Sequence, residues 1–379
     1  MLTIEQRFIL SLLQECVKGE KSEEVSCAEY HIIKEIILRN SILLTVYQRL
    51  PVDMKKQFEK VYLANIKQAV GQKYEGERVL QALSDAGFSV IALKGWELRK
   101  LYPNPNMRQM ADLDILVCPY EFDKIKTVMS QRGFLSGKET AWKHDSFRKQ
   151  YICVEMHKRL TDDSDKIQAW EKNIWDRATV VNGNIYKMNP EDYYIFHFVH
   201  LHNDFLNGSL GLRRIVDTWL LQKQLVDMKT VRSSLESFGM GKFHEKMVKL
   251  SQVTMGDEPM DEDSEVLLKH AFMNGIYGTE KSYKAGRIVA MGGSLKMGKL
   301  NSKLAAVFLP YKRMKAQFPT LEKWPILLPY YWIKRIIRFL KGDMKKNRRK
   351  LDYSNVNEAH YEEMKRFFEA GGITESVSS

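Results

Sequence analysis

The strongest constraint on how this chain folds comes from two short apolar runs. A glycine, a helix-like stretch and two prolines separate them. The first run, residues 90–93, stops just before Gly95, and the second run spans residues 113–117. Between them, residues 96–102 have helical spacing. Residues 103–105 contain two prolines, which require a loop because proline cannot continue a helix. The pattern predicts a strand, a glycine turn, a short helix, a loop and a second strand.

Two aspartates, Asp112 and Asp114, stand at the start of the second predicted strand. Residues i and i+2 of a strand point to the same face, roughly 6.6 Å apart at the backbone, so these carboxylates repel unless a positive charge or a shared proton lies between them. Mg²⁺ favours one or two carboxylates together with substrate phosphate oxygens. A helix that begins at Gly95 would direct free backbone N–H groups at an anion. Phosphate beside a metal is the arrangement that phosphoryl-group transfer requires.

This stretch resembles the nucleotidyltransferase (DNA polymerase beta-like) superfamily, which has a strand ending in glycine, an Asp-x-Asp on the next strand and a third acidic residue on a later strand. More closely, it is similar to an uncharacterised bacterial family of nucleotidyltransferase-like proteins. The elements that carry this similarity are Leu93-Lys94-Gly95, Tyr102-Pro103, Arg108 and Asp112-Leu113-Asp114-Ile115-Leu116-Val117. The chain departs from the pattern at Trp96, where a small residue is usual, and in the longer separation of the glycine from the aspartates.

The resemblance implies an α+β fold, with a nucleotidyltransferase-type mixed sheet core and N-terminal and C-terminal helical subdomains. Residues 151–157 alternate like a strand and place Cys153, Glu155 and His157 on one face. Glu155 is therefore the candidate third carboxylate, at a point where the resemblance places an acidic residue. His157 could contact a phosphate or the acceptor, or it could be a structural histidine.

These residues lead us to hypothesise a Mg²⁺-dependent nucleotidyltransferase that moves an NMP group from an NTP such as ATP to a hydroxyl acceptor. Asp112, Asp114 and Glu155 would bind Mg²⁺ or Mn²⁺. One ion would bridge the NTP phosphates and a second would lower the pKa of the acceptor hydroxyl. Glu155 would complete the second metal site or serve as the base. Lys94 and Gly95 would hold the triphosphate.

Five further residues are candidates for nucleotide or acceptor binding. Arg108 could neutralise charge on the pyrophosphate leaving group, or it could form a loop salt bridge. His200 and Asp204 stand where the family often has two histidines at the same spacing. Arg213 and Asp217 can pair on one helix face, because side chains four residues apart are neighbours there, or they could act in nucleotide or acceptor binding.

The net charge of +12 favours an anionic partner, such as a nucleotide, a nucleic acid, a polyanionic glycan or a membrane surface. Residues 304–340 are apolar, aromatic and basic, and a basic run follows at 345–350. This tail could bind anionic lipid or a polyanionic acceptor, or it could be a packed aromatic face with a solvated basic edge. Two alternatives to an enzyme therefore stay open. One is a catalytically silent nucleotide-binding or partner-binding module on the same fold, and the other is a nucleic-acid-binding protein that uses the basic tail.

Helical periodicity, together with what the resemblance implies for the core, suggests a division into four parts. Residues 1–74 are predicted to form an N-terminal helical subdomain, residues 75–188 the nucleotidyltransferase core, residues 189–280 a helical domain and residues 281–379 a basic and aromatic helical tail. Within this chain, residues 275–299 are rich in Gly, Lys and Ser and are predicted to form a flexible connection.

The cysteines and the hydropathy pattern indicate a cytoplasmic protein. No Cys-x-x-Cys spacing occurs, so we expect free thiols in a reducing compartment rather than disulfides or metal ligands. No signal-peptide pattern opens the chain, and no run approaches the roughly 18 apolar residues that a membrane span requires. The cysteines are Cys16, Cys27, Cys118 and Cys153.

Overall fold

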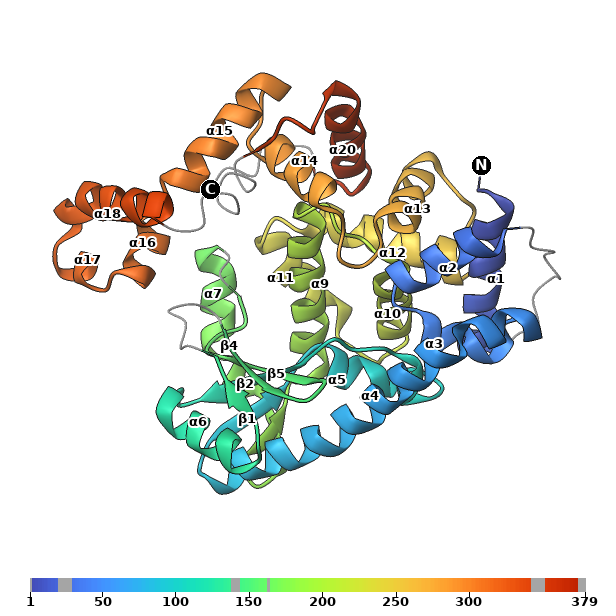
Figure 1. The fold of residues 1–379 in the computed structure, drawn as a ribbon, viewed down its shortest axis with the longest axis horizontal. Helices are drawn as coiled ribbons and strands as arrows, with labels where there is room; N and C mark the ends of the chain where they lie inside the picture. Colours follow the sequence, from blue (N-terminus) through green and yellow to red (C-terminus); the bar gives the residue numbers. More distant parts are fainter. Residues whose placement is uncertain (1, 20–28, 138–143, 162–163, 342–351, 374–379) are drawn as a thin grey trace.

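A seven-stranded mixed sheet lies at the centre of the computed structural model, which describes residues 2–19, 29–137, 144–161, 164–341 and 352–373 (Figure 1). The strand order is β3-β4-β5-β2-β1-β7-β6. The α+β fold with a mixed sheet is confirmed. The strands are β1 (Ser89–Ala92), β2 (Leu113–Cys118), β3 (Leu135–Ser136), β4 (His144–Lys149), β5 (Ile152–His157), β6 (Thr179–Asn182) and β7 (Ile185–Lys187).

Strand β2 occupies the position that organises the site. It runs antiparallel to β1 on one side and parallel to β5 on the other. In the register of β2 and β5, Asp114 lies directly opposite Glu155. Side chains of paired residues project from the same face of a sheet, so these two acidic residues are neighbours although they are far apart in the sequence.

The two faces of the sheet are covered by different helices (Figure 1). Alternate residues of β2 and β5 pack against the long helix α4 (Val52–Asp85) and helix α6 (Phe122–Gln131). On the opposite face, Leu116 packs in a cluster with Phe196 of helix α9 (Pro190–Leu206). Asp114 shares the face of Leu116 because residues two apart in a strand point the same way, and it therefore faces α9.

The N-terminal helices and the helices that follow the sheet share one hydrophobic core. Its buried side chains come from residues 8–58 as well as from residues 194–288 and 353–370. The predicted four-part division of the chain stays a prediction. The helices that contribute include α1 (Ile4–Lys18), α2 (Tyr30–Arg39), α3 (Leu43–Val46), the start of α4, α9, α10 (Leu212–Gln222), α11 (Met228–Ser237), α12 (Gly241–Met255), α13 (Glu262–Asn274), α14 (Glu280–Ala290) and α20 (Glu358–Ala370).

The prediction of a flexible connection over residues 275–299 is wrong. This segment contains α14 and the start of α15 (Leu295–Val307). Thr279 caps α14 with a capping box, and the Ser294 side chain caps α15. A Cβ at Gly298 would lie 2.6 Å from the carbonyl oxygen of Ile288, so this glycine allows α15 to pack closely on α14. The glycine that suggested flexibility is a packing residue.

The remaining elements are short or lie toward the C-terminus. Helix α6 begins three residues after Pro119, and strand β4 was not predicted. The basic run 345–350 and Cys27 lie outside the described residues. Among the described residues, no helix has the length and apolar character needed to cross a membrane. The other helices are α5 (Gly95–Leu98), α7 (Asp165–Lys172), α8 (Ile174–Arg177), α16 (Tyr311–Gln317), α17 (Thr320–Lys323) and α18 (Leu328–Lys341).

Candidate active site

A cavity of about 290 Å³ lies between the sheet and helices α9 and α10, and most of the predicted site residues line it. Three predicted residues do not line it but contact its walls. Asp217 binds Arg108, His157 contacts Asp114, and Glu155 lies opposite Asp114 on β5. The eight predicted residues in the lining are Lys94, Gly95, Arg108, Asp112, Asp114, His200, Asp204 and Arg213.

Asp114 is buried at the floor of the cavity and is held by two partners. Lys94 Nζ donates to Asp114 Oδ1 at 2.7 Å, and His157 Nε2 lies 2.7 Å from the same oxygen. Burial alone would raise the pKa of Asp114, but Lys94 and His157 outweigh it and hold this pKa well below its usual range. Burial lowers the pKa of His157 to about 4 despite Asp114. At neutral pH, Asp114 is therefore charged and His157 donates as a neutral imidazole.

Asp112 lies just before the first residue of β2 and is only partly buried. Burial and the repulsion of Asp114 raise the pKa of Asp112 above its ordinary value. The two aspartates are thus different in character. The chain supplies its own cation to Asp114, whereas Asp112 is open to the cavity and lacks comparable stabilisation of its charge.

The side chains of His144, Glu155 and His157 form a group that could hold a metal ion beside Asp114. One ligand atom from each residue lies within 4.8 Å of the others. Glu155 Oε2 is 3.4 Å from His144 Nε2 and 3.8 Å from His157 Nε2. Carboxylate oxygens suit Mg²⁺ and Mn²⁺, and the imidazole nitrogens extend the donor set toward transition metals. Sequence reasoning missed His144, because only the pairing of β4 with β5 places it opposite His157.

The backbone at Lys94 and Gly95 is fixed by close packing. Lys94 has a φ of 46°, a conformation that non-glycine residues rarely adopt. The hydroxyl of Tyr193 on α9 donates to the Lys94 carbonyl oxygen at 2.6 Å. A Cβ at Gly95 would lie 2.5 Å from Arg108 Nη1 and 2.7 Å from Met110 Sδ. Glycine is therefore required where the turn meets the cavity wall.

Packing explains why Trp96 stands where the family pattern has a small residue. Trp96 belongs to the hydrophobic cluster between the sheet and α4. A Cβ at Gly76 of α4 would lie 2.6 Å from the indole ring, so Gly76 provides the space for that ring. Trp96 contributes to the core between α4 and the sheet, and it does not line the cavity beside Gly95.

Arg108 and Asp217 form a buried ion pair. The Nε and Nη2 atoms of Arg108 donate to the two carboxylate oxygens of Asp217, each at 2.7 Å, and the Tyr102 hydroxyl donates to Asp217 at 2.9 Å. The suggested helix pairing of Arg213 with Asp217 is not the arrangement in the structure, because Arg213 donates to the Gln109 carbonyl oxygen. The loop salt bridge considered for Arg108 exists, with a partner on α10.

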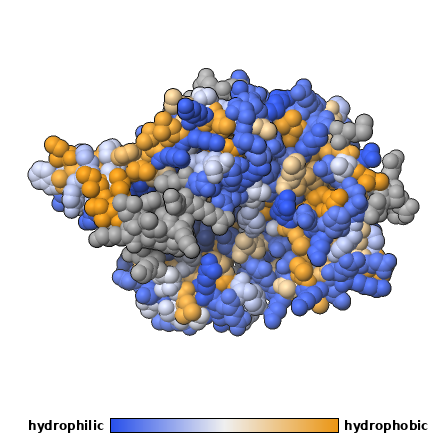
Figure 2. All heavy atoms as spheres, turned by 45° about the horizontal axis from the view of Figure 1, so that its top comes forward, coloured by the Kyte–Doolittle hydropathy of each residue, from blue (hydrophilic) through white to orange (hydrophobic). Residues whose placement is uncertain are grey.

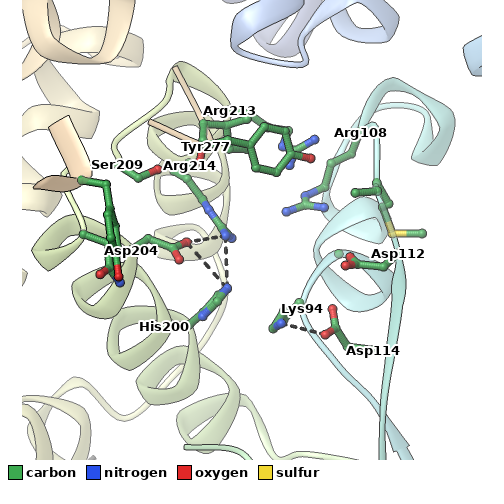
Figure 3. A pocket seen from close by; sticks show the side chains of 16 residues that line it. Lys94, Arg108, Asp112, Asp114, His200, Asp204, Ser209, Arg213, Arg214 and Tyr277 are labelled. Carbon is green, nitrogen blue, oxygen red and sulfur yellow. Dashed lines mark hydrogen bonds and ion pairs between the residues drawn. The ribbon is translucent and has the colours of Figure 1, made fainter. Parts of the chain in front are cut away.

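The opposite wall of the cavity comes from α9 and α10 (Figure 3). Arg214 Nη2 donates to Asp204 Oδ2 at 2.6 Å and lies 3.1 Å from His200 Nε2. Asp204 stands where the family often has a second histidine, and here it holds Arg214 at the cavity. Figure 3 shows this group facing Lys94, Asp112 and Asp114. We did not single out Arg214 from the sequence, although its place next to Arg213 was a signal.

Three features of this site are typical of the nucleotidyltransferase class of α+β proteins. They are an Asp-x-Asp at the start of a central strand, a glycine turn on the neighbouring strand and an acidic residue in register on the next strand. The chain matches a family described as "Uncharacterised nucleotidyltransferase" over residues 20–256, and it belongs to this family. No match was found among proteins of curated function or among solved structures. Family membership supports nucleotidyl transfer as the general activity and a nucleotide as substrate.

Proposed function

We propose that the protein transfers an NMP group from an NTP to a hydroxyl acceptor in a reaction that requires Mg²⁺ or Mn²⁺, in the cytoplasm. One observation carries this proposal. Across a cavity of about 290 Å³, the wall with Asp112 and Asp114 faces Arg214, and Arg213 lines the same cavity. Carboxylates suit a divalent cation, and guanidinium groups suit phosphate oxygens.

The carboxylate wall fits a divalent cation. Asp114 already attracts the ammonium group of Lys94, whereas burial and the charge of Asp114 raise the pKa of Asp112, and a cation beside Asp112 would offset that repulsion. Asp112, Asp114 and Glu155 would hold the metal, with His144 and His157 next to Glu155. When bound, the cation would neutralise phosphate charge and lower the pKa of the acceptor hydroxyl.

The arginine wall fits the phosphates. The buried Nε atoms of Arg213 and Arg214 have no hydrogen-bond partner among the described residues. Burial and the charge of Arg108 lower the pKa of Arg213 to about 10. An anion in the cavity beside Arg213 and Arg214 would offset the repulsion between these guanidinium groups. Two nitrogens of Arg108 bind Asp217, so a contact of Arg108 with the pyrophosphate, through Nη1, stays a prediction.

In the proposed reaction, the acceptor oxygen forms a bond to the α-phosphorus of the NTP. The bond from that phosphorus to the oxygen bridging the β-phosphate breaks, and pyrophosphate leaves with the electron pair. We assign the removal of the acceptor proton to the carboxylate of Glu155. Lys94 and the backbone at Gly95 would hold the triphosphate. His200 and Asp204 position Arg214 and are the residues we propose to meet the acceptor or a phosphate.

The test is a thermal-shift and pyrophosphate-release series with ATP, GTP, CTP and UTP, with and without Mg²⁺ or Mn²⁺. The variant is Asp112→Asn, because Asp112 is partly exposed and its loss leaves no buried partner unpaired. We expect kcat/KM to fall by about 10³-fold or more, which corresponds to about 4 kcal/mol, with the melting temperature changed by less than about 1 °C. Asp257→Asn, the same change in an exposed loop, is the matched control.

Three outcomes separate the alternatives. A nucleotide-selective shift that needs metal and Asp112, together with pyrophosphate release, supports the proposal and identifies the donor. A shift without pyrophosphate release for any acceptor screened would indicate the catalytically silent binding module. The absence of a shift with every nucleotide would contradict nucleotide binding at this cavity.

A further inference from the structure

The C-terminal platform, which we define as residues 308–341, is a small folded unit that projects from the end of α15 (Figure 1). It has its own interior, because Met314 and Leu321 are fully buried and the rings of Phe318 and Tyr331 stack with centroids 4.4 Å apart. Among the described residues, no side chain of the platform belongs to the three large hydrophobic clusters of the protein.

Helix α18 is fixed in orientation within the platform. The Trp332 indole Nε1 donates to the Leu309 carbonyl oxygen at 3.0 Å, and Arg335 donates to the carbonyl oxygens of Ala306 and Val307 at 2.8 and 2.7 Å. These bonds attach one side of α18 to the end of α15. The opposite side of α18 is therefore held facing outward.

That outward side is apolar. Tyr330, Ile333 and Ile337 recur at helical spacing and are 56%, 58% and 45% exposed, and in the preceding turn Trp324 and Ile326 are 61% and 83% exposed. Surface helices of globular proteins usually turn their apolar side toward the core. Figure 2 shows hydrophobic residues gathered on this projecting part of the molecule. A continuous exposed apolar stripe indicates an interaction surface.

The platform and the helix that carries it are also strongly basic. Residues 294–341 contain eleven Lys and Arg residues and a single acidic residue, Glu322, in a chain of net charge +12. Lys334 Nζ lies 5.7 Å from the ring centroid of Tyr331, so a cationic group stands against an aromatic ring on α18. The surface therefore combines an apolar stripe with an excess of positive charge.

We propose that the platform docks on the surface of an anionic lipid bilayer, with α18 lying in the plane of the interface. Trp and Tyr side chains favour the membrane interface, aliphatic side chains gain from contact with acyl chains, and Lys and Arg gain from anionic headgroups. A nucleic acid would use the charges and stack on aromatic rings, but it would leave Ile326 and Ile333 without a favourable environment. A second copy of the chain would bring two positive surfaces together.

The experiment is co-sedimentation of the full chain with vesicles of phosphatidylcholine alone or with ~30% phosphatidylglycerol. We expect the partition coefficient to be at least about tenfold higher for the anionic vesicles and to fall as salt is raised. The double variant Ile326→Asp, Ile333→Asp should lower it by a further factor of about ten or more. The matched control is Val181→Asp, Leu225→Asp, which adds the same two charges at positions 59% and 95% exposed outside the platform, and we expect it to bind like wild type.

Each remaining outcome would overturn the inference. Equal vesicle binding by both double variants would show that the apolar stripe is not involved. Binding to heparin that is insensitive to Ile326→Asp, Ile333→Asp, without vesicle binding, would indicate a polyanion site. Concentration-dependent dimers by light scattering that the same variant abolishes, without vesicle binding, would indicate self-association. Unchanged melting temperatures show that the variants are folded, and none of these measurements depends on nucleotidyl transfer.

Discussion

Two buried ion pairs of the same length stand close together in this protein and play different parts. Lys94 with Asp114 and Arg108 with Asp217 both have nitrogen to oxygen distances of 2.7 Å. In the first pair the side chains are 21% and 3% exposed, and in the second they are 3% and 0% exposed. The first pair is open to the cavity through its lysine. The second, which we call the sealed pair, is almost fully buried and borders the cavity only through Arg108.

The donor geometry of the two pairs differs as much as their exposure. Arg108 binds both oxygens of Asp217 with a planar fork, and Tyr102 adds a third hydrogen bond. Lys94 is a single point charge on a flexible chain and can change partner when a phosphate or cation enters. A short buried ion pair therefore does not by itself identify a binding site. A pair that a ligand can reach, and that can exchange partners with it, does.

The largest effect we predict tests the sealed pair. Asp217→Asn leaves the charge of Arg108 buried without a counter-charge, so we expect the free energy of unfolding to fall by about 3 kcal/mol in urea denaturation. The double variant Arg108→Met, Asp217→Leu removes both charges and should recover most of that loss. If Asp217→Asn abolished nucleotide binding with unchanged stability, the pair would belong to the site, and the contrast with Lys94 and Asp114 would be broken.

A smaller predicted effect tests whether water is excluded from the region around the sealed pair. His197 is buried with its Nε2 3.0 Å from Thr218 Oγ1, and burial lowers its pKa to about 3. Because this pKa lies below the unfolded value near 6.5, protons bind the unfolded chain preferentially between these values. The contribution of His197 to stability is therefore complete above about pH 6.5 and falls by about 1.4 kcal/mol per pH unit below it, or about 2 kcal/mol at pH 5.

The measurement is the free energy of unfolding at pH 7, 6 and 5. In His197→Gln, the decrease in the free energy of unfolding per pH unit should be smaller by the contribution of one proton. Burial also lowers the pKa values of His202, His244 and His270, so these histidines contribute to the decrease that remains. His31→Gln, the same change at an exposed histidine, is the matched control. An unchanged slope in His197→Gln would show that water reaches this histidine.

The smallest effect tests the open pair. In Lys94→Met, His157 still donates to Asp114 and the cavity can supply water, so we expect a loss of only about 1 kcal/mol in the free energy of unfolding. We expect the affinity for the NTP to fall about tenfold in a binding titration, because a phosphate contact is lost. Lys100→Met, which removes a surface pair with Glu97, is the matched control. A stability loss as large as that of Asp217→Asn would make the open pair a structural one.

Part of the fold and of the site could be predicted because the signals are local. The alternation of residues 151–157 predicts β5 and its two faces. Residues 275–299 were misinterpreted as flexible because a glycine that allows close helix packing, such as Gly298, cannot be told from a flexible one by sequence alone. His144 was missed because its significance depends on a strand pairing rather than on its neighbours in sequence.

Local sequence is enough to predict the strand, the glycine turn and the aspartates around Gly95, Asp112 and Asp114, because strand periodicity and turn formation depend on residues within a few positions of each other. The pairing of Arg108 with Asp217, 109 positions away, and the position of Arg214 opposite the aspartates follow from the packing of distant segments. The helix spacing of Arg213 and Asp217 favoured a different pair. A buried charge takes the partner that offers the best geometry, and that partner is defined only when distant segments pack together.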